Sequence, residues 1–250
     1  MTRRVIGTRL IRRGVVSSTM DEAMLLADEG AAEGTVVLAE HQTAGRGRAG
    51  RVWTEHPGDG LLLSVILRPP VPVDRLALLP LLIGVAVAEA LEKMAVVACQ
   101  VKWPNDIWID DRKIAGILIT SHQRGGTRTV IAGIGVNVDM PVERLAEGAV
   151  SLRKACGRCV RVEDLLHALI DVLNAAYVRF VEQDGRVGLA DWKKRAALLG
   201  ERVVVVQDGE AITGLFHDVD EDGALVLLTD AGECRRVVSG DLVRGPSRIG

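Results

Sequence analysis

The chain has 250 residues, of which 48% are apolar and 26% are charged, so it has room for one large globular domain or two unequal ones. Its 31 basic and 33 acidic residues give a net charge of −2, which excludes attachment to nucleic acid or membrane by bulk charge. The longest uncharged stretch, residues 76–88, is shorter than the roughly 20 residues of a membrane span. We therefore expect a buried helix there, no membrane anchor and no DNA partner.

The N-terminal segment is rich in arginine and carries no acidic residue before position 21. This composition is faintly similar to that of a transit peptide, but no apolar secretory core follows it. We favour a first strand with solvated arginines, in which alternation turns Val5, Leu10 and Val15 inward. The arginines concerned are Arg3, Arg4, Arg9, Arg12 and Arg13.

Four scattered cysteines are too few for a disulfide framework in a chain of this length, which favours a reducing, cytoplasmic location. Cys156 and Cys159 are separated by two residues, but no second pair and no spaced histidines accompany them. Two incidental thiols are therefore a better interpretation than a zinc or redox site.

The first 200 residues predict a mixed or largely antiparallel sheet with helices, and thus an α+β fold. Ser18 and Thr19 precede an acidic pair and an apolar pattern at Ala23, Leu26 and Ala27, which indicates a capped helix start. Further helices are expected over 74–94, 162–182 and 187–199. Strands are expected over 35–39, 61–67, 96–102, 107–109, 113–121 and 127–138.

The pattern changes after Gly200, where short strands are joined by dipeptides that hairpins prefer, such as Asp208-Gly209 and Asp222-Gly223. The expected strands are 202–206, 211–218, 224–228 and 234–238. So short a segment predicts a small barrel that leans on a larger neighbour. We therefore expect a catalytic domain over 1–200 and a second domain over 201–250.

A basic, glycine-rich segment runs from Gly45 to Arg51, with three glycines and three arginines in seven positions. Its letters match the dinucleotide-binding pattern, but that pattern must open a helix, and Pro57, Gly58 and Gly60 follow instead. Glycines let a backbone approach a ligand, and arginine forks suit carboxylate or phosphate oxygens. The segment therefore predicts an anion clamp, with a solvated basic turn as the alternative.

Two more segments carry groups suited to chemistry. Lys102-Trp103-Pro104-Asn105-Asp106 follows a strand, and proline would leave Asn105 and Asp106 at the tip of a turn, where a carboxylate could hold a metal ion or take a proton. An ordinary β-turn explains the same residues equally well. Lys113 begins an apolar strand, where a simple strand-edge charge is the alternative to a functional lysine.

These segments, in this order and spacing, resemble the biotin protein ligase family. The resemblance extends from about Val15 to the C-terminal barrel and rests on residues 45–53, 102–106, 113–118 and 133–138. It implies a class II synthetase-like catalytic domain followed by an SH3-like barrel. It also implies ATP-dependent formation of biotinyl-5′-adenylate. Transfer of biotin to one lysine of a biotin carboxyl carrier domain would follow, in a biotin-dependent carboxylase such as acetyl-CoA carboxylase.

The resemblance assigns roles to the matching positions. It implies that the biotin ring lies against Ser18, Thr19 and Gln42, and that its carboxylate end lies near Gly45, Arg46 and Lys113. It implies that ATP is met by Arg48, Arg51, Trp53, Asn105 and Asn137. It places Lys102, Asn105 and Asp106 near the reacting phosphoryl group and Mg²⁺. It also implies that Arg48, Lys102, Asp106 and Lys113 are the catalytic residues.

Met20 departs from the family pattern, which often has asparagine after Ser-Thr, and one polar contact to biotin is therefore in doubt. Two-function family members that also repress transcription carry an N-terminal helix-turn-helix, and the 16 residues before Ser17 are too few for one. A nucleic-acid-binding module and a lipoate ligase are competing hypotheses for the same residues. The acceptor carboxylase and the choice between monomer and homodimer stay open.

Overall fold

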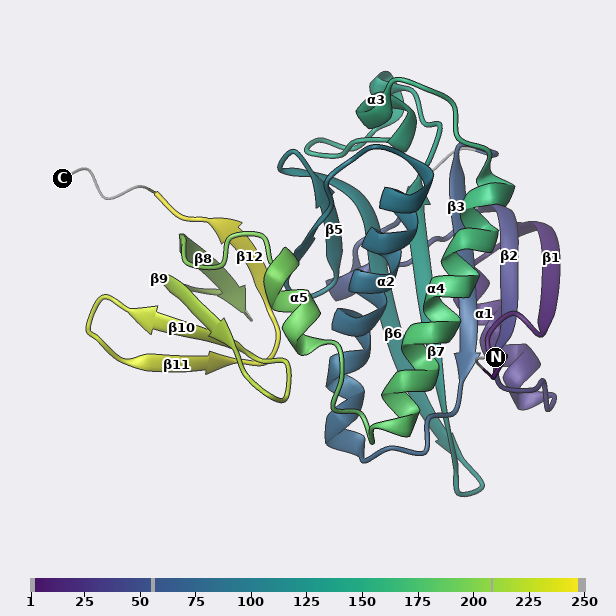
Figure 1. The fold of residues 1–250 in the computed structure, drawn as a ribbon, viewed down its shortest axis with the longest axis horizontal. Coiled ribbons are helices and arrows are strands. Elements are labelled where there is room, and N and C mark those ends of the chain that lie inside the picture. Colours follow the sequence, from purple (N-terminus) through teal and green to yellow (C-terminus); the bar gives the residue numbers. More distant parts are fainter. Residues whose placement is uncertain (1–2, 55–56, 208, 247–250) are drawn as a thin grey trace.

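The computed structural model describes residues 3–54, 57–207 and 209–246, and its main feature is a seven-stranded mixed sheet (Figure 1). Only the edge pair β1 and β2 is parallel, and the remaining neighbours are antiparallel. In sheet order the strands are β1 (Arg9–Val16), β2 (Thr35–Gln42), β3 (Gly60–Leu67), β7 (Thr127–Asn137), β6 (Arg112–Arg124), β5 (Asp106–Ile109) and β4 (Gln100–Lys102). This confirms the expected α+β class.

Helices cover the two faces of this sheet unequally. On one face lie α2 (Leu79–Met94) and α4 (Val162–Glu182), which pack against each other in front of the strands in Figure 1. The opposite face carries the shorter α1 (Thr19–Asp28), which contacts β2, β3 and β7. The remaining helical elements are α3 (Leu152–Cys156), α5 (Leu189–Arg195) and three 3₁₀ turns, η1 (Arg48–Gly50), η2 (Val73–Leu78) and η3 (Val142–Arg144).

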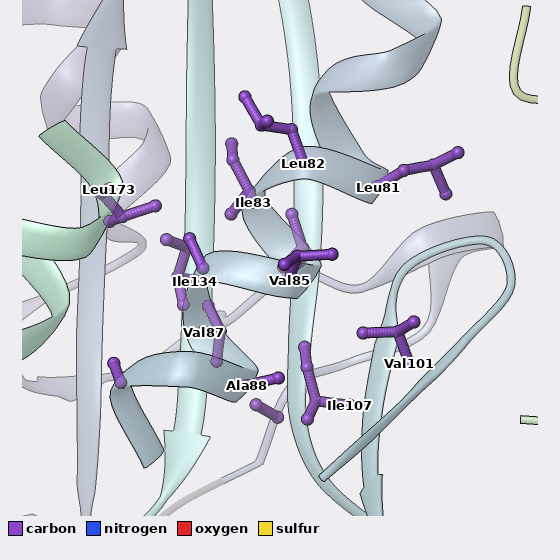
Figure 2. Packing of buried hydrophobic residues seen from close by; sticks show 14 of the residues in the cluster. Leu81, Leu82, Ile83, Val85, Val87, Ala88, Val101, Ile107, Ile134 and Leu173 are labelled. Atoms are coloured by element: carbon purple, nitrogen blue, oxygen red, sulfur yellow. The ribbon is translucent and has the colours of Figure 1, made fainter. Parts of the chain in front are cut away.

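Alternation along the central strands explains why one face is a core and the other can hold a ligand. In β7, Ala132, Ile134 and Val136 belong to the main apolar core, which α2 fills with Leu82, Ile83 and Val87 (Figure 2). Their neighbours Gly133, Gly135 and Asn137 point to the opposite face, since successive side chains alternate. Because α1 is short and these residues are small, that face stays open beyond α1.

The C-terminal segment forms a second, five-stranded antiparallel sheet in the order β11-β10-β9-β8-β12. Its strands are β8 (Arg202–Gln207), β9 (Glu210–Val219), β10 (Leu225–Thr229), β11 (Cys234–Val237) and β12 (Asp241–Arg244). The expected small C-terminal β domain is confirmed, but its sheet is not closed into a barrel, since β11 and β12 remain separate edges among the described residues. The last strand, β12, was not predicted from the sequence, and it pairs with β8.

The second sheet is attached to the first through specific contacts. Trp103 Nε1 donates a 3.0 Å hydrogen bond to the carbonyl oxygen of Gly223. Arg244 pairs with Asp111 at 3.1 Å, and Lys193 pairs with Asp218 at 2.7 Å. Trp103 is thereby a buried docking residue rather than a ligand-binding face.

Several expected boundaries differ from those observed. Val15 is 67% exposed, because residues 10 and 15 are five apart and cannot share a face of one strand; Ile6 and Val16 are the buried residues. Residues 96–99 precede β4 rather than belong to it. The helix expected from 74 begins as a 3₁₀ turn, because Pro80 favours the first turn of an α-helix. The helix expected over 187–199 is confined to α5.

No helix in the described ranges combines the length and apolar character needed to cross a membrane. All four cysteines are free, and they differ sharply in surroundings: Cys99 is buried, Cys156 is half-buried, and Cys159 and Cys234 are exposed.

We expect Cys99 to resist thiol reagents in the folded protein, because burial and the nearby carboxylate of Glu92 raise its pKa to about 12. A colorimetric thiol titration at pH 8 should label Cys159 and Cys234 within minutes and Cys99 only after unfolding in denaturant. Rapid labelling of Cys99 in native protein, identified by peptide mass, would contradict this burial.

Candidate functional site

The open part of the sheet holds a cavity of about 150 Å³ beside the start of α1. Ser18 caps α1, its Oγ accepting from the backbone N–H of Met20 at 3.2 Å. The N–H and Oγ1 of Thr19 both donate to Oε1 of Gln42, at 2.8 and 3.1 Å, and Ser64 Oγ donates to Thr19 Oγ1. This end of the cavity is therefore uncharged, polar and held by its own hydrogen bonds.

The glycine-arginine segment folds over the cavity as a closed loop, here called the clamp loop (residues 45–53). Arg46 and Val52 form a bridge, and the N–H of Trp53 donates to the carbonyl oxygen of Gly45 at 2.9 Å. A Cβ on Gly45 would lie 2.5 Å from the Trp53 carbonyl oxygen, so the loop closes only with glycine there. Within the described residues the short turn η1 follows Gly47, in place of the helix that a dinucleotide-binding pattern must open.

The three arginines of the clamp loop have different partners. Arg46 pairs with Asp21 in the first turn of α1, and Arg51 pairs with Asp241 of β12 at 2.8 Å. Arg48 Nη1 donates only to uncharged oxygens, Oδ1 of Asn105 and the Gly240 carbonyl, both at 3.3 Å. Burial lowers the pKa of Arg48, with the charge of Asp241 opposing the shift. Arg48 is thus a half-buried cation without a direct carboxylate partner among the described residues.

The predicted turn at 102–106 lies against the clamp loop and the start of β6. Lys113 Nζ lies 2.7 Å from Oδ1 of Asp106, an oxygen that is buried and makes no hydrogen bond among the described residues. Asn105 Nδ2 donates to the Ile117 carbonyl at 2.7 Å, which leaves its Oδ1 facing Arg48. Lys113 therefore lines the cavity and pairs with Asp106, so it is more than an isolated charge at a strand edge.

Lys102 adds a third cation to this region. Its ammonium lies 4.5 Å from the centre of the Trp108 ring, and burial lowers its pKa while the nearby Asp106 raises it. Arg48, Lys102 and Lys113 thus gather around Asn105 and Asp106, an arrangement suited to an anion that brings its own charge.

A second cavity of about 130 Å³ lies on the other side of Trp53. It is lined by Asn137 at the end of β7, by Met140, and by Ala146 and Ala149 of the following loop. Asn137 Nδ2 donates to the Val150 carbonyl at 3.3 Å. Trp53 and Lys113 line both cavities and separate the polar end near Gln42 from the end near Asn137.

Most of the sequence-predicted residues line these two cavities, whereas Gly45, Lys102 and Asp106 line neither. The structure also adds partners that the sequence did not reveal. Asp21 and Asp241 each form an ion pair with an arginine of the clamp loop. Gly116 and Gly135 form the floor of the first cavity. In the sequence, the only sign of these carboxylates is that exposed arginines need counter-charges. That rule does not indicate which of the 33 acidic residues pair with them.

The comparisons with known proteins agree with this geometry. Residues 14–137 match the Biotin/lipoate A/B protein ligase family, and residues 198–245 match the Biotin protein ligase C terminal domain. Fold and site together thus define a protein of the biotin and lipoate ligase class.

Individual relatives narrow the class. The biotin--[acetyl-CoA-carboxylase] ligase of Paracoccus denitrificans is 36% identical over 86% of this chain and 92% of its own length. The bifunctional ligase/repressor BirA of Bacillus subtilis is 34% identical over 96% of this chain and 75% of its own. The Aquifex aeolicus biotin protein ligase in complex with biotin and ATP superposes with a TM-score of 0.82 at 29% identity, covering 95% of this chain and 100% of that one. The chain belongs to the biotin protein ligase family.

Proposed function

We propose that the protein is an ATP-dependent biotin protein ligase. It forms biotinyl-5′-adenylate and then transfers biotin to a lysine of a biotin carboxyl carrier domain. The observation that carries this proposal is the cluster of Arg48, Lys102 and Lys113 around Asn105 and Asp106, in which Arg48 and Lys113 line the first cavity and Lys113 also lines the second. One cavity suits a neutral ring with a carboxylate tail, and the cations suit the phosphates that this tail must attack.

Biotin is assigned to the cavity at the start of α1. Ser18, Thr19 and Gln42 offer hydroxyl and amide groups to the ring head, in rigid positions because they bond to one another or cap the helix. The carboxylate end then lies toward Gly45, Arg46 and Lys113. Met20 lines the cavity as an apolar wall, so the asparagine common in the family is replaced by packing.

ATP is assigned to the clamp loop and the second cavity. Arg48 and Arg51 meet the phosphates, Asn137 meets the adenine edge, and Trp53 covers the base once both substrates are bound. The buried Oδ1 of Asp106, which pairs with Lys113, and the Oδ1 of Asn105, which accepts from Arg48, are hard oxygen donors of the kind Mg²⁺ takes together with phosphate oxygens. Asp106 and Asn105 would hold the ion, which would neutralise phosphate charge.

The negative charges of the biotin carboxylate and of the ATP phosphates must be neutralised before the reacting atoms can be oriented. In the first step a carboxylate oxygen attacks the α-phosphorus, a new P–O bond forms, and the bond to the departing pyrophosphate breaks. Two anions meet, so preorganised cations at the developing charge lower the barrier, each by roughly 3 kcal/mol. In the second step the lysine amine attacks the acyl carbon and AMP leaves. Asp106 is placed to orient that amine or to accept its proton.

Further expectations belong to the same proposal. Residues 1–200 act as the catalytic domain and 201–250 as a C-terminal domain that also contacts the clamp loop through Gly240 and Asp241. The acceptor is the carrier protein or domain of a carboxylase such as acetyl-CoA carboxylase, in the cytoplasm. The partners are biotin, ATP and this carrier, with no DNA and no membrane.

A pyrophosphate-release assay with biotin and lipoate side by side tests the proposal. We expect ATP- and Mg²⁺-dependent pyrophosphate release with biotin, little with lipoate, and biotin labelling of a purified carrier domain detected by its mass. A carrier with its acceptor lysine replaced by arginine is the control and should stay unlabelled. Release that requires lipoate, or no biotin-dependent release from folded protein, would overturn the assignment.

A further inference from the structure

The floor of the first cavity contains two glycines that face each other across neighbouring strands. Gly116 of β6 and Gly135 of β7 are direct partners in the antiparallel register. Neither has a left-handed φ, so the backbone at these positions is open to any residue. Their lack of a side chain therefore matters for the space above the sheet rather than for the chain conformation.

That space is filled by the indole of Trp53. A Cβ on Gly135 would lie 2.6 Å from Cε2 and 2.7 Å from Cζ2 of the indole. A Cβ on Gly116 would lie 3.1 Å from Cζ3 and equally close to the ammonium end of Lys113. The ring thus lies directly on the bare backbone of two paired strands, next to Lys113, whose Nζ is 5.6 Å from the ring centre.

Trp53 is also the last residue of the clamp loop, so the position of its ring fixes the loop. Its N–H closes the loop onto Gly45, and the bridge between Arg46 and Val52 holds the two arms together. The segment that carries Arg48 therefore has one end anchored to the sheet.

The anchorage leaves one polar atom unsatisfied. Trp53 Nε1 is buried and has no acceptor among the described residues. A buried donor without a partner is destabilising, because it has lost its hydrogen bonds to water. The ring is therefore held by packing and by the ammonium of Lys113, and its N–H is free of protein acceptors among the described residues.

We propose that Gly116 and Gly135 are positioning residues that form a seat for Trp53, and that the seated indole holds the clamp loop closed between the two cavities. The purpose of the seat, which is to place Arg48 at the phosphates, rests on the proposed function. The seat itself is a physical property of the ligand-free protein.

The space between the two strands and the indole limits which side chains the seat can accept. Both strands lie inside the seven-stranded sheet, with neighbours on each side, so the backbone cannot retreat from an added methyl group. At Gly135 the atoms in the way belong to a rigid ring, so the indole has to leave its place. Gly133, two residues earlier on the same face, would press instead on the flexible end of Met20, 2.8 Å from its Sδ.

Limited trypsin digestion without any substrate tests the seat, with cleavage after Arg46, Arg48 and Arg51 followed by mass spectrometry. We expect Gly135→Ala to raise the rate of clamp-loop cleavage by about 10-fold or more, because the closed loop loses its anchor. Gly133→Ala is the matched control and should cleave like the unchanged protein. Equal cleavage of G135A and the unchanged protein would overturn the seat.

A double-mutant cycle identifies Trp53 as the partner. Trp53→Leu removes the ring, so we expect it to open the loop by itself, and Gly135→Ala added to it should change cleavage by less than about 2-fold. An undiminished effect of G135A in the W53L background would overturn the proposal, since the methyl group would then act elsewhere. If G135A does not fold, Gly116→Ala, with its looser 3.1 Å contact, enters the same cycle with a smaller expected increase.

The kinetics connect the seat to the reaction. In G135A we expect the KM for ATP to rise by about 10-fold or more, because the loop that carries Arg48 loses its anchor. An unchanged KM for ATP in a G135A protein whose clamp loop is cleaved faster would overturn the link between the seat and the placement of Arg48. The digestion needs no substrate, so a protein that lacks biotin-dependent activity would overturn the proposed function while leaving the seat intact.

Discussion

Replacing Arg48 with alanine is expected to lower the rate of biotin-dependent pyrophosphate release by on the order of 10²-fold or more. The guanidinium is half-buried and bonds only to the uncharged oxygens of Asn105 and Gly240. Its charge is therefore not neutralised by a direct carboxylate contact among the described residues. A cation that is desolvated and preorganised stabilises developing phosphate charge far better than one in water.

Arg51 provides the matched control, since it sits three residues away in the same loop and carries the same group. Its side chain is 57% exposed and is paired with Asp241, so its charge is screened by water and by a carboxylate. Arg51→Ala should therefore cost less than about 10-fold, mostly in the KM for ATP. Equal losses for the two variants, measured as initial pyrophosphate-release rates at saturating biotin, would show that Arg48 has no special place.

The general position of the site could be predicted because each motif adjoins a strand of one sheet. Gln42 ends β2, Asn105 and Asp106 precede or begin β5, and Lys113 lies at the start of β6. Gln42 and Lys113 lie at strand ends on one edge of the sheet, and the antiparallel register that pairs Asp106 with Gly116 brings Asp106 close to Lys113. The sequence indicated the motifs and their relation to strands, whereas the order of strands in the sheet decided which motifs meet.

Contacts between distant segments were beyond the sequence. The pairing of Arg46 with Asp21 joins the clamp loop to a helix, and that of Arg51 with Asp241 joins it to the second sheet. Surface ion pairs of this kind contribute little energy and leave no local pattern. The strand β12 was also missed, because it is only four residues long and so offers too few positions for a pattern of alternation.

The glycine pair shows a different limit of sequence reasoning. Residues 113–118 and 133–138 are recognisable as motifs, but Gly116 and Gly135 acquire meaning only from the register that sets them opposite each other. A glycine in a strand weakens it and needs a reason, which is often the close approach of another group. Here that group is an indole from a loop more than 60 residues earlier in the chain than Gly116.

Lys113→Ala should lose adenylation by on the order of 10²-fold or more, because Nζ of Lys113 is the cation nearest to Asp106 and lies beside Trp53, between the two cavities. The substitution also leaves the carboxylate of Asp106 without its partner, and an uncompensated buried charge can itself destabilise the protein.

The double variant Lys113→Ala with Asp106→Asn separates the two effects. It removes the unpaired charge, so its melting temperature should return toward that of the unchanged protein, while adenylation stays low because the cation is still missing. Both are measured on the same preparations, by thermal unfolding and by pyrophosphate release. If the double variant recovers the rate together with the stability, then Lys113 serves only to neutralise Asp106, and the carboxylate of biotin must be met by Arg46 or Arg48 instead.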